Sequence, residues 1–231
     1  MYRYELHCHT AKVSACSRLS AREMVDLYLT NGYDGIFVTD HFLNGNAKVD
    51  RTLPYRDQVD RFMDGYREVK EVAGDRLQVF FGFEYSYKGT DVLTYGWDFE
   101  ELASYPEILS MSMREYCDFC AAHGALAVQA HPFRLADYID HIRLFTNAEG
   151  VEILNAGRDK RANTLAAVYA EAFGKIVTGG SDLHVPTQPI LSGMAFEERL
   201  QSPAHMIELL HAGKGEIIRQ DNRYGKKQGQ N

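Results

Sequence analysis

Two histidines stand one residue apart near the start of the chain, in the stretch ELHCHTAKVSACS at residues 5–17. If this stretch forms a β-strand, His7 and His9 lie on the same face and can direct both imidazoles at one point. Imidazole nitrogens bind zinc, manganese or iron, but two histidines alone do not make a metal site. The remaining ligands must come from other parts of the chain.

Further histidines and carboxylates follow short apolar runs that are typical of buried strands. The runs are GIFVT at 35–39, LQVFFGF at 77–83, ALAVQ at 125–129, GVEILN at 150–155 and KIVTGG at 175–180. The polar residues that come after them and offer metal-binding atoms are His41, Glu84, His131, Asp182 and His184. Residues 91–97 favour one more strand, which Asp91 begins.

Amphipathic segments at 20–31, 59–73, 112–123, 160–173 and 203–212 predict helices between most of these strands. Ser20 with Glu23, and Ser112 with Glu115, have the spacing of capping boxes at the starts of two of these helices. Alternating strands and helices favour a parallel sheet, and this many units fit an α/β barrel that is closed or nearly closed. In such barrels functional residues lie at the carboxyl ends of the strands, where the candidate ligands above would meet. We expect a single domain over residues 1–218 and a polar, frayed tail over 219–231.

The composition narrows the class of protein. With 231 residues, of which 45% are hydrophobic and 25% charged, the chain is long enough to bury one large core. It contains no apolar run of about 18 residues and no secretory signal pattern, so we expect a cytoplasmic protein with reduced cysteines and no membrane contact. The net charge of -7 argues against an extended nucleic-acid surface and leaves a small phosphorylated substrate open.

Converging imidazoles and carboxylates predict a hydrolytic site with more than one metal ion. Two ions roughly 3.5 to 4 Å apart lower the pKa of a shared water and stabilise the oxygens of a displacement at phosphorus. Phosphoester hydrolysis is therefore the reaction class that these residues favour.

The motifs also resemble a known family. H-x-H-T at 7–10, T-D-H at 39–41, the glutamate at 84, A-H-P at 130–132 and G-S-D-x-H at 180–184 are similar, in this order, to the motifs of the PHP family, named for polymerase and histidinol phosphatase. The resemblance implies a distorted seven-stranded (β/α) barrel, two or three divalent metal ions and phosphoesterase activity.

The resemblance further implies three metal sites. Their ligands are His7, His9, Glu84 and Asp182 in the first, Glu84 and His131 in the second, and His41 and His184 in the third. Glu84 would then bridge two ions. The native metal is left open among zinc, manganese and iron.

The chain departs from the family pattern at two positions. Asp91 stands where many members have a histidine, and an aspartate can still bind a metal. Cys16 lies in the region where many members have an aspartate or histidine, and it is either a thiolate ligand of the third site or a small buried side chain. We predict two tightly held ions and a third that is held weakly.

Several other polar residues on the same face are candidates for supporting roles. Arg134 and Arg158 lie in predicted loops and could bind a phosphate, with Lys12 and Arg18 as weaker candidates. Asp40 could orient an imidazole.

The stretch CDFCAAH at 117–123 resembles part of a zinc-binding motif. On a helix, however, Cys117, Cys120 and His123 spread around the surface, so we expect small thiols packed against the barrel.

Two alternative functions remain open. An amidohydrolase also begins with H-x-H on a barrel, but it usually bridges its metals with a carboxylated lysine, and Lys88 lies in a predicted loop beyond Glu84. A non-catalytic metal-binding regulatory module is the second alternative. The sequence does not predict the substrate or the oligomeric state.

Overall fold

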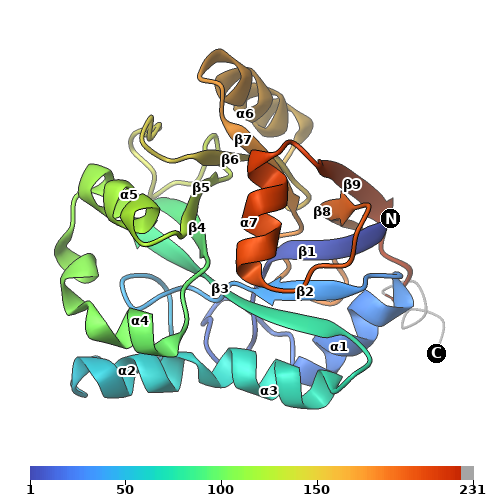
Figure 1. Ribbon diagram of the computed structural model, residues 1–231, viewed down its shortest axis with the longest axis horizontal. Helices are drawn as coiled ribbons and strands as arrows, with labels where there is room; N and C mark the ends of the chain where they lie inside the picture. The colour runs from blue at the N-terminus through green and yellow to red at the C-terminus, as the bar shows by residue number, and fades with distance from the viewer. Residues whose placement is uncertain (225–231) are drawn as a thin grey trace.

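The computed structural model describes residues 1–224 of the chain, in which strands and helices alternate along most of the sequence (Figure 1). The strands are β1 (Tyr2–Cys8), β2 (Gly35–Val38), β3 (Gln78–Tyr87), β4 (Thr90–Tyr95), β5 (Leu126–Ala130), β6 (Gly150–Asn155), β7 (Ile176–Gly180), β8 (Ile190–Phe196) and β9 (Gly215–Asp221). The helices are α1 (Ala21–Thr30), α2 (Tyr55–Phe62), α3 (Asp64–Ala73), α4 (Phe99–Ser104), α5 (Met113–Ala122), α6 (Lys160–Ala172), α7 (Pro203–His211) and the 3-10 helix η1 (Pro106–Ser110).

All of these strands belong to one sheet, in the order β7-β6-β5-β4-β3-β2-β1-β8-β9. Strands β1, β2 and β3 are parallel to one another, as are β5, β6 and β7. The prediction of a wholly parallel sheet is wrong for β4, which is antiparallel to both β3 and β5, and for β8 and β9, which are antiparallel to their neighbours. The turn of two residues between β3 and β4 is too short for a parallel crossover, which needs a dozen residues or more.

Strands β1 to β7 form the barrel, which closes where the end of β1 meets the end of β7. Strand β1 can make this contact because β8 pairs only with its first residues. Its first residues pair with β8, whereas its last residue, Cys8, forms a parallel bridge with Leu183 just after β7. The amide of His9 donates a hydrogen bond of 3.1 Å to the carbonyl of Leu183, which continues this contact. The expected distorted barrel of seven strands is therefore confirmed, with β8 and β9 added outside it.

Helix α7 covers the amino end of the barrel. It contacts both β4 and β7, and Figure 1 shows it lying in front of the strands. Its buried side chains Met206 and Leu209 belong to an apolar cluster that includes Tyr4 and Leu126, which lie near the starts of β1 and β5. The carboxyl ends of the parallel strands lie at the other end of the barrel.

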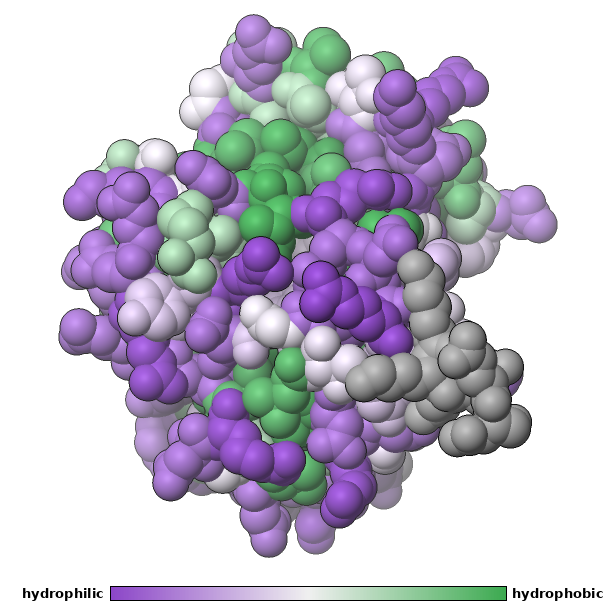
Figure 2. All heavy atoms as spheres, turned by 90° about the vertical axis from the view of Figure 1, so that its right-hand side faces the viewer, coloured by the Kyte–Doolittle hydropathy of each residue, from purple (hydrophilic) through white to green (hydrophobic). Residues whose placement is uncertain are grey.

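Most large apolar side chains are buried in such clusters. Figure 2 shows the face that carries the N-terminus and β9, where hydrophilic side chains predominate and hydrophobic ones gather in smaller patches above and below the middle. No helix in the described residues is long and apolar enough to cross a membrane.

The capping signals placed several helices correctly. Ser20 and Glu23 form the predicted capping box of α1, and Ser112 with Glu115 forms that of α5. The helix expected over 59–73 is instead two helices that meet at Met63.

Several elements differ from the predictions. Strand β3 continues past Glu84 to Tyr87, because its last residues pair with β4 after its pairing with β2 has ended. Strand β8 and helix α4 were not predicted. Strand β9 extends to Asp221, beyond the domain boundary predicted at residue 218, because it pairs with β8 over its whole length. The rest of the expected tail, from residue 225 onwards, lies outside the described residues.

Candidate metal centre

The candidate ligands come from separate strands and meet at the carboxyl end of the barrel. His7 belongs to β1 and His9 follows it, while His41 comes after β2 and His131 after β5. Asp182 and His184 follow β7, whereas Glu84 and Asp91 lie within β3 and β4. All of these side chains except that of His184, which is partly exposed, are buried.

The carboxylate of Glu84 lies at the centre of the cluster and is 1% exposed. One of its oxygens lies 2.7 Å from Nδ1 of His41 and 3.5 Å from Nε2 of His9. The other oxygen lies 3.3 Å from Nε2 of His7 and 3.3 Å from Nε2 of His131. One carboxylate therefore faces four imidazoles from three different segments, which is the arrangement that a bridging ligand requires.

Asp182 provides a second carboxylate beside the same imidazoles. Its Oδ1 lies 3.5 Å from Nε2 of His7 and 3.4 Å from Nε2 of His9, and its Oδ2 lies 3.9 Å from Nε2 of His131. Both Asp182 and His131 have positive φ angles, 52° and 28°, which are uncommon for residues other than glycine. Such backbone strain gathers at functional sites, where the surrounding structure fixes a side chain in place.

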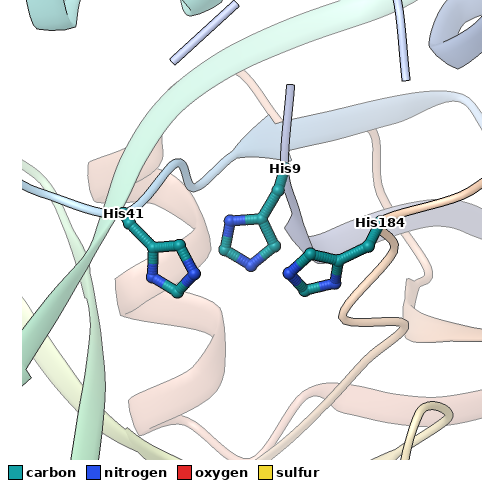
Figure 3. A group of neighbouring side chains, drawn as sticks. All are labelled: His9, His41 and His184. Carbon is teal, nitrogen blue, oxygen red and sulfur yellow. The ribbon is translucent and has the colours of Figure 1, made fainter. Parts of the chain in front are cut away.

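The ligand atoms form four overlapping groups of three, and in each group they lie within 4.8 Å of one another. The groups are His7, His9 and Glu84; His7, His131 and Asp182; His41, Glu84 and Asp91; and His9, His41 and His184. In the last group the three rings point toward one another, and the ring centroid of His9 lies 4.6 Å from that of His41 and 4.4 Å from that of His184 (Figure 3).

Several ligand atoms at this centre are buried but make no hydrogen bond of good geometry with any described residue. They are Nε2 of His7, Nε2 of His9, Nδ1 of His41 and both carboxylate oxygens of Glu84. Buried polar atoms are normally satisfied, so these atoms indicate partners of another kind. Divalent cations fit, because imidazole nitrogens and carboxylate oxygens are their usual ligands.

The charges of the site favour the same conclusion. Burial raises the pKa of Glu84, but the charges of His41 and His7 outweigh it and hold this pKa well below its ordinary value. Burial and the neighbouring His184 lower the pKa of His9 to about 3. Glu84 is therefore ionised and His9 neutral at pH 7, which are the forms that bind metals. Burial lowers the pKa of His41, but the charge of Glu84 outweighs it and raises this pKa to about 11, so His41 must release a proton when an ion binds.

Comparison with solved structures supports this fold. The chain aligns over 94% of its length with a two-domain protein from Bacteroides vulgatus that contains a predicted PHP-like metal-dependent phosphoesterase, with a TM-score of 0.66 and 15% identity. The chain has the fold of the PHP-like phosphoesterases. It spans 64% of the Bacteroides protein.

Two other solved structures share this fold. An amidohydrolase from Chromobacterium violaceum aligns with a TM-score of 0.54 and 14% identity, over 94% of this chain and 97% of that protein. A lesion-specific endonuclease from Pyrococcus furiosus aligns with a TM-score of 0.55 and 12% identity, over 94% of this chain and 57% of that protein. No family model and no curated protein matches the sequence.

One carboxylate beside the candidate metal centre was missed by the sequence analysis. Glu152, in β6, is fully buried, and its Oε1 lies 2.9 Å from Nδ1 of His7. Its Oε2 accepts hydrogen bonds from the amide of His131 at 3.1 Å and from Nδ2 of Asn155 at 2.8 Å. Glu152 thus orients the imidazole of His7 and the backbone of His131. A charged residue in the middle of the apolar run GVEILN was the signal that could have revealed it.

Asp40 acts on an imidazole through an intermediate side chain. Its carboxylate accepts hydrogen bonds from the amide of Thr10 at 2.7 Å and from Oγ of Ser14 at 2.6 Å. Ser14 Oγ in turn lies 3.3 Å from Nδ1 of His9. Asp40 therefore fixes the serine that contacts His9 and does not itself contact that ring.

The two predicted arginines both lie at the centre, but each is paired with a candidate ligand. Nη2 of Arg134 lies 2.9 Å from Oδ2 of Asp91, whose Oδ1 accepts a hydrogen bond from Ser86. Nη2 of Arg158 lies 2.7 Å from Oδ2 of Asp182. Both arginines line a cavity of about 400 Å³ together with Glu84, Asp91, His131, Asp182 and His184. Lys12 and Arg18 are not among the described residues that line it.

The four cysteines have different surroundings. Cys16 is exposed and lines the same cavity as His41 and His184. Partial burial raises its pKa, but these two imidazoles lower it more, to about 6. Cys8 is buried in the cluster around α1.

The C-x-x-C stretch of α5 lies in the apolar core. Cys117 and Cys120 are buried there, and burial raises the pKa of Cys117 to about 12. Nδ1 of His123 lies 2.8 Å from the carbonyl of Phe119. None of the metal-binding groups found in the described residues includes these three side chains.

Proposed function

We propose that this protein is a metal-dependent phosphoesterase that hydrolyses a phosphate ester of a small molecule or a short nucleotide. The observation that carries the proposal is the buried carboxylate of Glu84, which lies within 3.5 Å of four imidazole nitrogens. A bridging carboxylate surrounded by imidazoles is suited to a site with two ions, and such sites catalyse displacement at phosphorus.

We assign the ligands from the motifs that resemble the PHP family together with the distances between their side chains. His7, His9, Glu84 and Asp182 would hold one ion, Glu84, His131 and Asp91 a second, and His41, His184 and His9 or Cys16 a third. Bound divalent ions supply Lewis acidity and activate water for attack on the phosphate. We expect zinc, manganese or iron, in two or three sites.

The protein's own residues would hold these ligands and the substrate in place. Glu152 and Ser14 fix the imidazoles of His7 and His9 through the nitrogens that face away from the centre. Arg158 and Arg134 hold the carboxylates of Asp182 and Asp91, and we propose that their remaining donors position the phosphate.

A small substrate is favoured over a long nucleic acid. The net charge of -7 does not provide a broad basic surface, and the cavity above the candidate ligands has a volume of about 400 Å³. The similarity to an endonuclease keeps short oligonucleotides among the substrates to test.

The test is a metal-dependence assay. We expect the purified protein, supplied with manganese or zinc, to release phosphate from p-nitrophenyl phosphate, its bis ester or a member of a panel of phosphorylated metabolites. Failure of every ester with every metal would contradict the proposal. A full complement of bound metal without any turnover would favour the non-catalytic binding module instead.

An amidohydrolase is the second candidate, because the protein from Chromobacterium violaceum with that description has the same fold over nearly its whole length. However, no lysine lines the cavity in the described part of the chain, so a carboxylated lysine has no position there. Turnover of lactams or cyclic ureas in the absence of phosphatase activity would reverse the order of the two candidates.

A further inference from the structure

A second cavity adjoins the metal centre. It has a volume of about 310 Å³ and lies between the segment that follows β5 and the amino end of α6. Arg134 and Arg158 line both this cavity and the one above the candidate ligands. We call it the side pocket. The two cavities are therefore neighbours that share these two side chains.

The walls of the side pocket are largely apolar. Phe133, Leu135 and Ile142 come from the segment after β5, and Ala162 and Leu165 come from α6. Leu135 is 76% exposed, Ile142 50% and Leu165 40%, so large apolar side chains surround the pocket without being covered. Exposed apolar side chains that gather around a cavity are typical of a binding site.

Two fixed arginine side chains lie at the boundary between the two cavities. The Nε atoms of Arg134 and Arg158 are buried and have no hydrogen-bond partner among the described residues. The Nη2 atoms of the same side chains are already bound to Asp91 and Asp182, which fixes both guanidinium groups. The side chains of Arg134 and Arg158 are still 15% and 27% exposed, so a ligand with acceptor oxygens at this boundary can reach them.

The charged residues at the pocket restrict the ligand further. Arg161, in the first turn of α6, lines the pocket, and Asp159 uses one oxygen to cap the helix by accepting a hydrogen bond from the amide of Ala162 at 2.8 Å. With three arginines and one aspartate around it, the pocket disfavours a cationic group. The apolar walls disfavour a polyhydroxylated sugar, whose hydroxyl groups would lose water without gaining partners.

From these observations we infer that the side pocket binds the organic part of the substrate, and that this part is an uncharged or anionic apolar group of aryl size. The phosphate would lie at the metal centre, its oxygens would accept hydrogen bonds at the two arginines, and the apolar group would lie between Phe133, Ile142 and Leu165. This inference rests on the proposed phosphoesterase function and specifies its substrate class.

Two phosphonates that cannot be hydrolysed separate the two parts of the site. Methylphosphonate tests the metal centre alone, whereas 3-phenylpropylphosphonate adds an apolar group that can reach the side pocket. We expect the manganese-loaded protein to bind the phenylpropyl compound at least about tenfold more tightly, because the phenyl group leaves water. Isothermal titration calorimetry measures both affinities.

A matched pair of variants on α6 locates the effect. Ala162→Trp should fill the pocket and reduce the preference for the phenylpropyl compound to less than about threefold, with the affinity for methylphosphonate unchanged. Val168→Trp, on the same helix, places the same side chain at a residue that is 58% exposed and does not line the pocket, so it should keep the full preference.

The outcomes distinguish the inference from the function on which it rests. If the protein binds both phosphonates equally, or if Ala162→Trp keeps the full preference, the side pocket is not the substrate subsite, although the metal centre still is one. If the manganese-loaded protein does not bind methylphosphonate, the proposed phosphoesterase site itself is wrong.

Discussion

At the scale of single residues, Glu84 and His131 can be separated by experiment. Glu84→Gln keeps the shape of the side chain but removes the charge shared by two sites, so it should release both tightly held ions. His131→Ala should mainly empty the second site. We expect each change to reduce activity at least about a hundredfold. Metal analysis by plasma mass spectrometry checks this, and a Glu84→Gln protein that keeps both ions and most of its activity would refute the bridging role.

Whether Cys16 is a ligand determines how firmly a third ion is held. His41 and His184 are neutral ligands when they bind a metal, and without the thiolate they would hold an ion only weakly. We predict that exhaustive dialysis leaves two ions per chain in the wild type and in Cys16→Ser, and that added phosphate allows a third ion to be retained. Three retained ions in the wild type without phosphate, falling to two in Cys16→Ser, would instead make Cys16 a ligand.

At the scale of elements, Gly180 allows β7 to lie against the side chains of its neighbours. A Cβ atom at this position would lie 2.5 Å from Cβ of His7 and 2.6 Å from Oε1 of Glu152. Gly180→Ala must therefore displace the pair that positions one of the candidate ligands. We expect metal affinity, measured by competition with a fluorescent chelator, to fall at least about tenfold.

A second glycine provides the control for this prediction. Gly213 has a φ angle of +67° and no heavy atom within 4 Å of a Cβ at that position. Gly213→Ala should destabilise the fold by about 1–2 kcal/mol through backbone strain while it leaves metal affinity unchanged. Equal metal affinities for the two alanine variants would show that close packing at Gly180 does not position the ligands.

At the scale of the whole molecule, the metal centre joins segments that are distant in sequence. The candidate ligands follow or belong to β1, β2, β3, β4, β5 and β7, and the unfolded chain cannot bring these segments together at one ion. An ion at a hundredfold excess over its dissociation constant stabilises a fold by about 2.7 kcal/mol. For a chain of this size, each ion that a chelator removes should lower Tm by about 5 to 10 °C.

Circular dichroism melts before chelation, after chelation and after manganese is added back measure this effect. His131→Ala should show a smaller shift than the wild type, because it loses one ion before the chelator is added. A wild-type Tm that does not change, in a sample shown to have lost its ions, would mean that the centre does not couple to folding.

The sequence by itself determined the features that depend on neighbouring residues. The apolar runs predicted the strands, and the polar residues directly after them predicted the candidate ligands, because the functional residues of such barrels lie at the carboxyl ends of the strands. A serine followed three residues later by a glutamate predicted the helix starts at Ser20 and Ser112, because a capping box is a contact within one turn.

Only the tertiary structure decided the features that depend on residues far apart in the chain. It made β4 antiparallel, extended β3 past Glu84, and added Glu152 to the site as the partner of His7. It also paired Arg134 with Asp91, although 43 residues separate them. These contacts form because strand pairing and burial remove polar groups from water and require a partner for each, and the identity of that partner is set by the packing of the whole barrel.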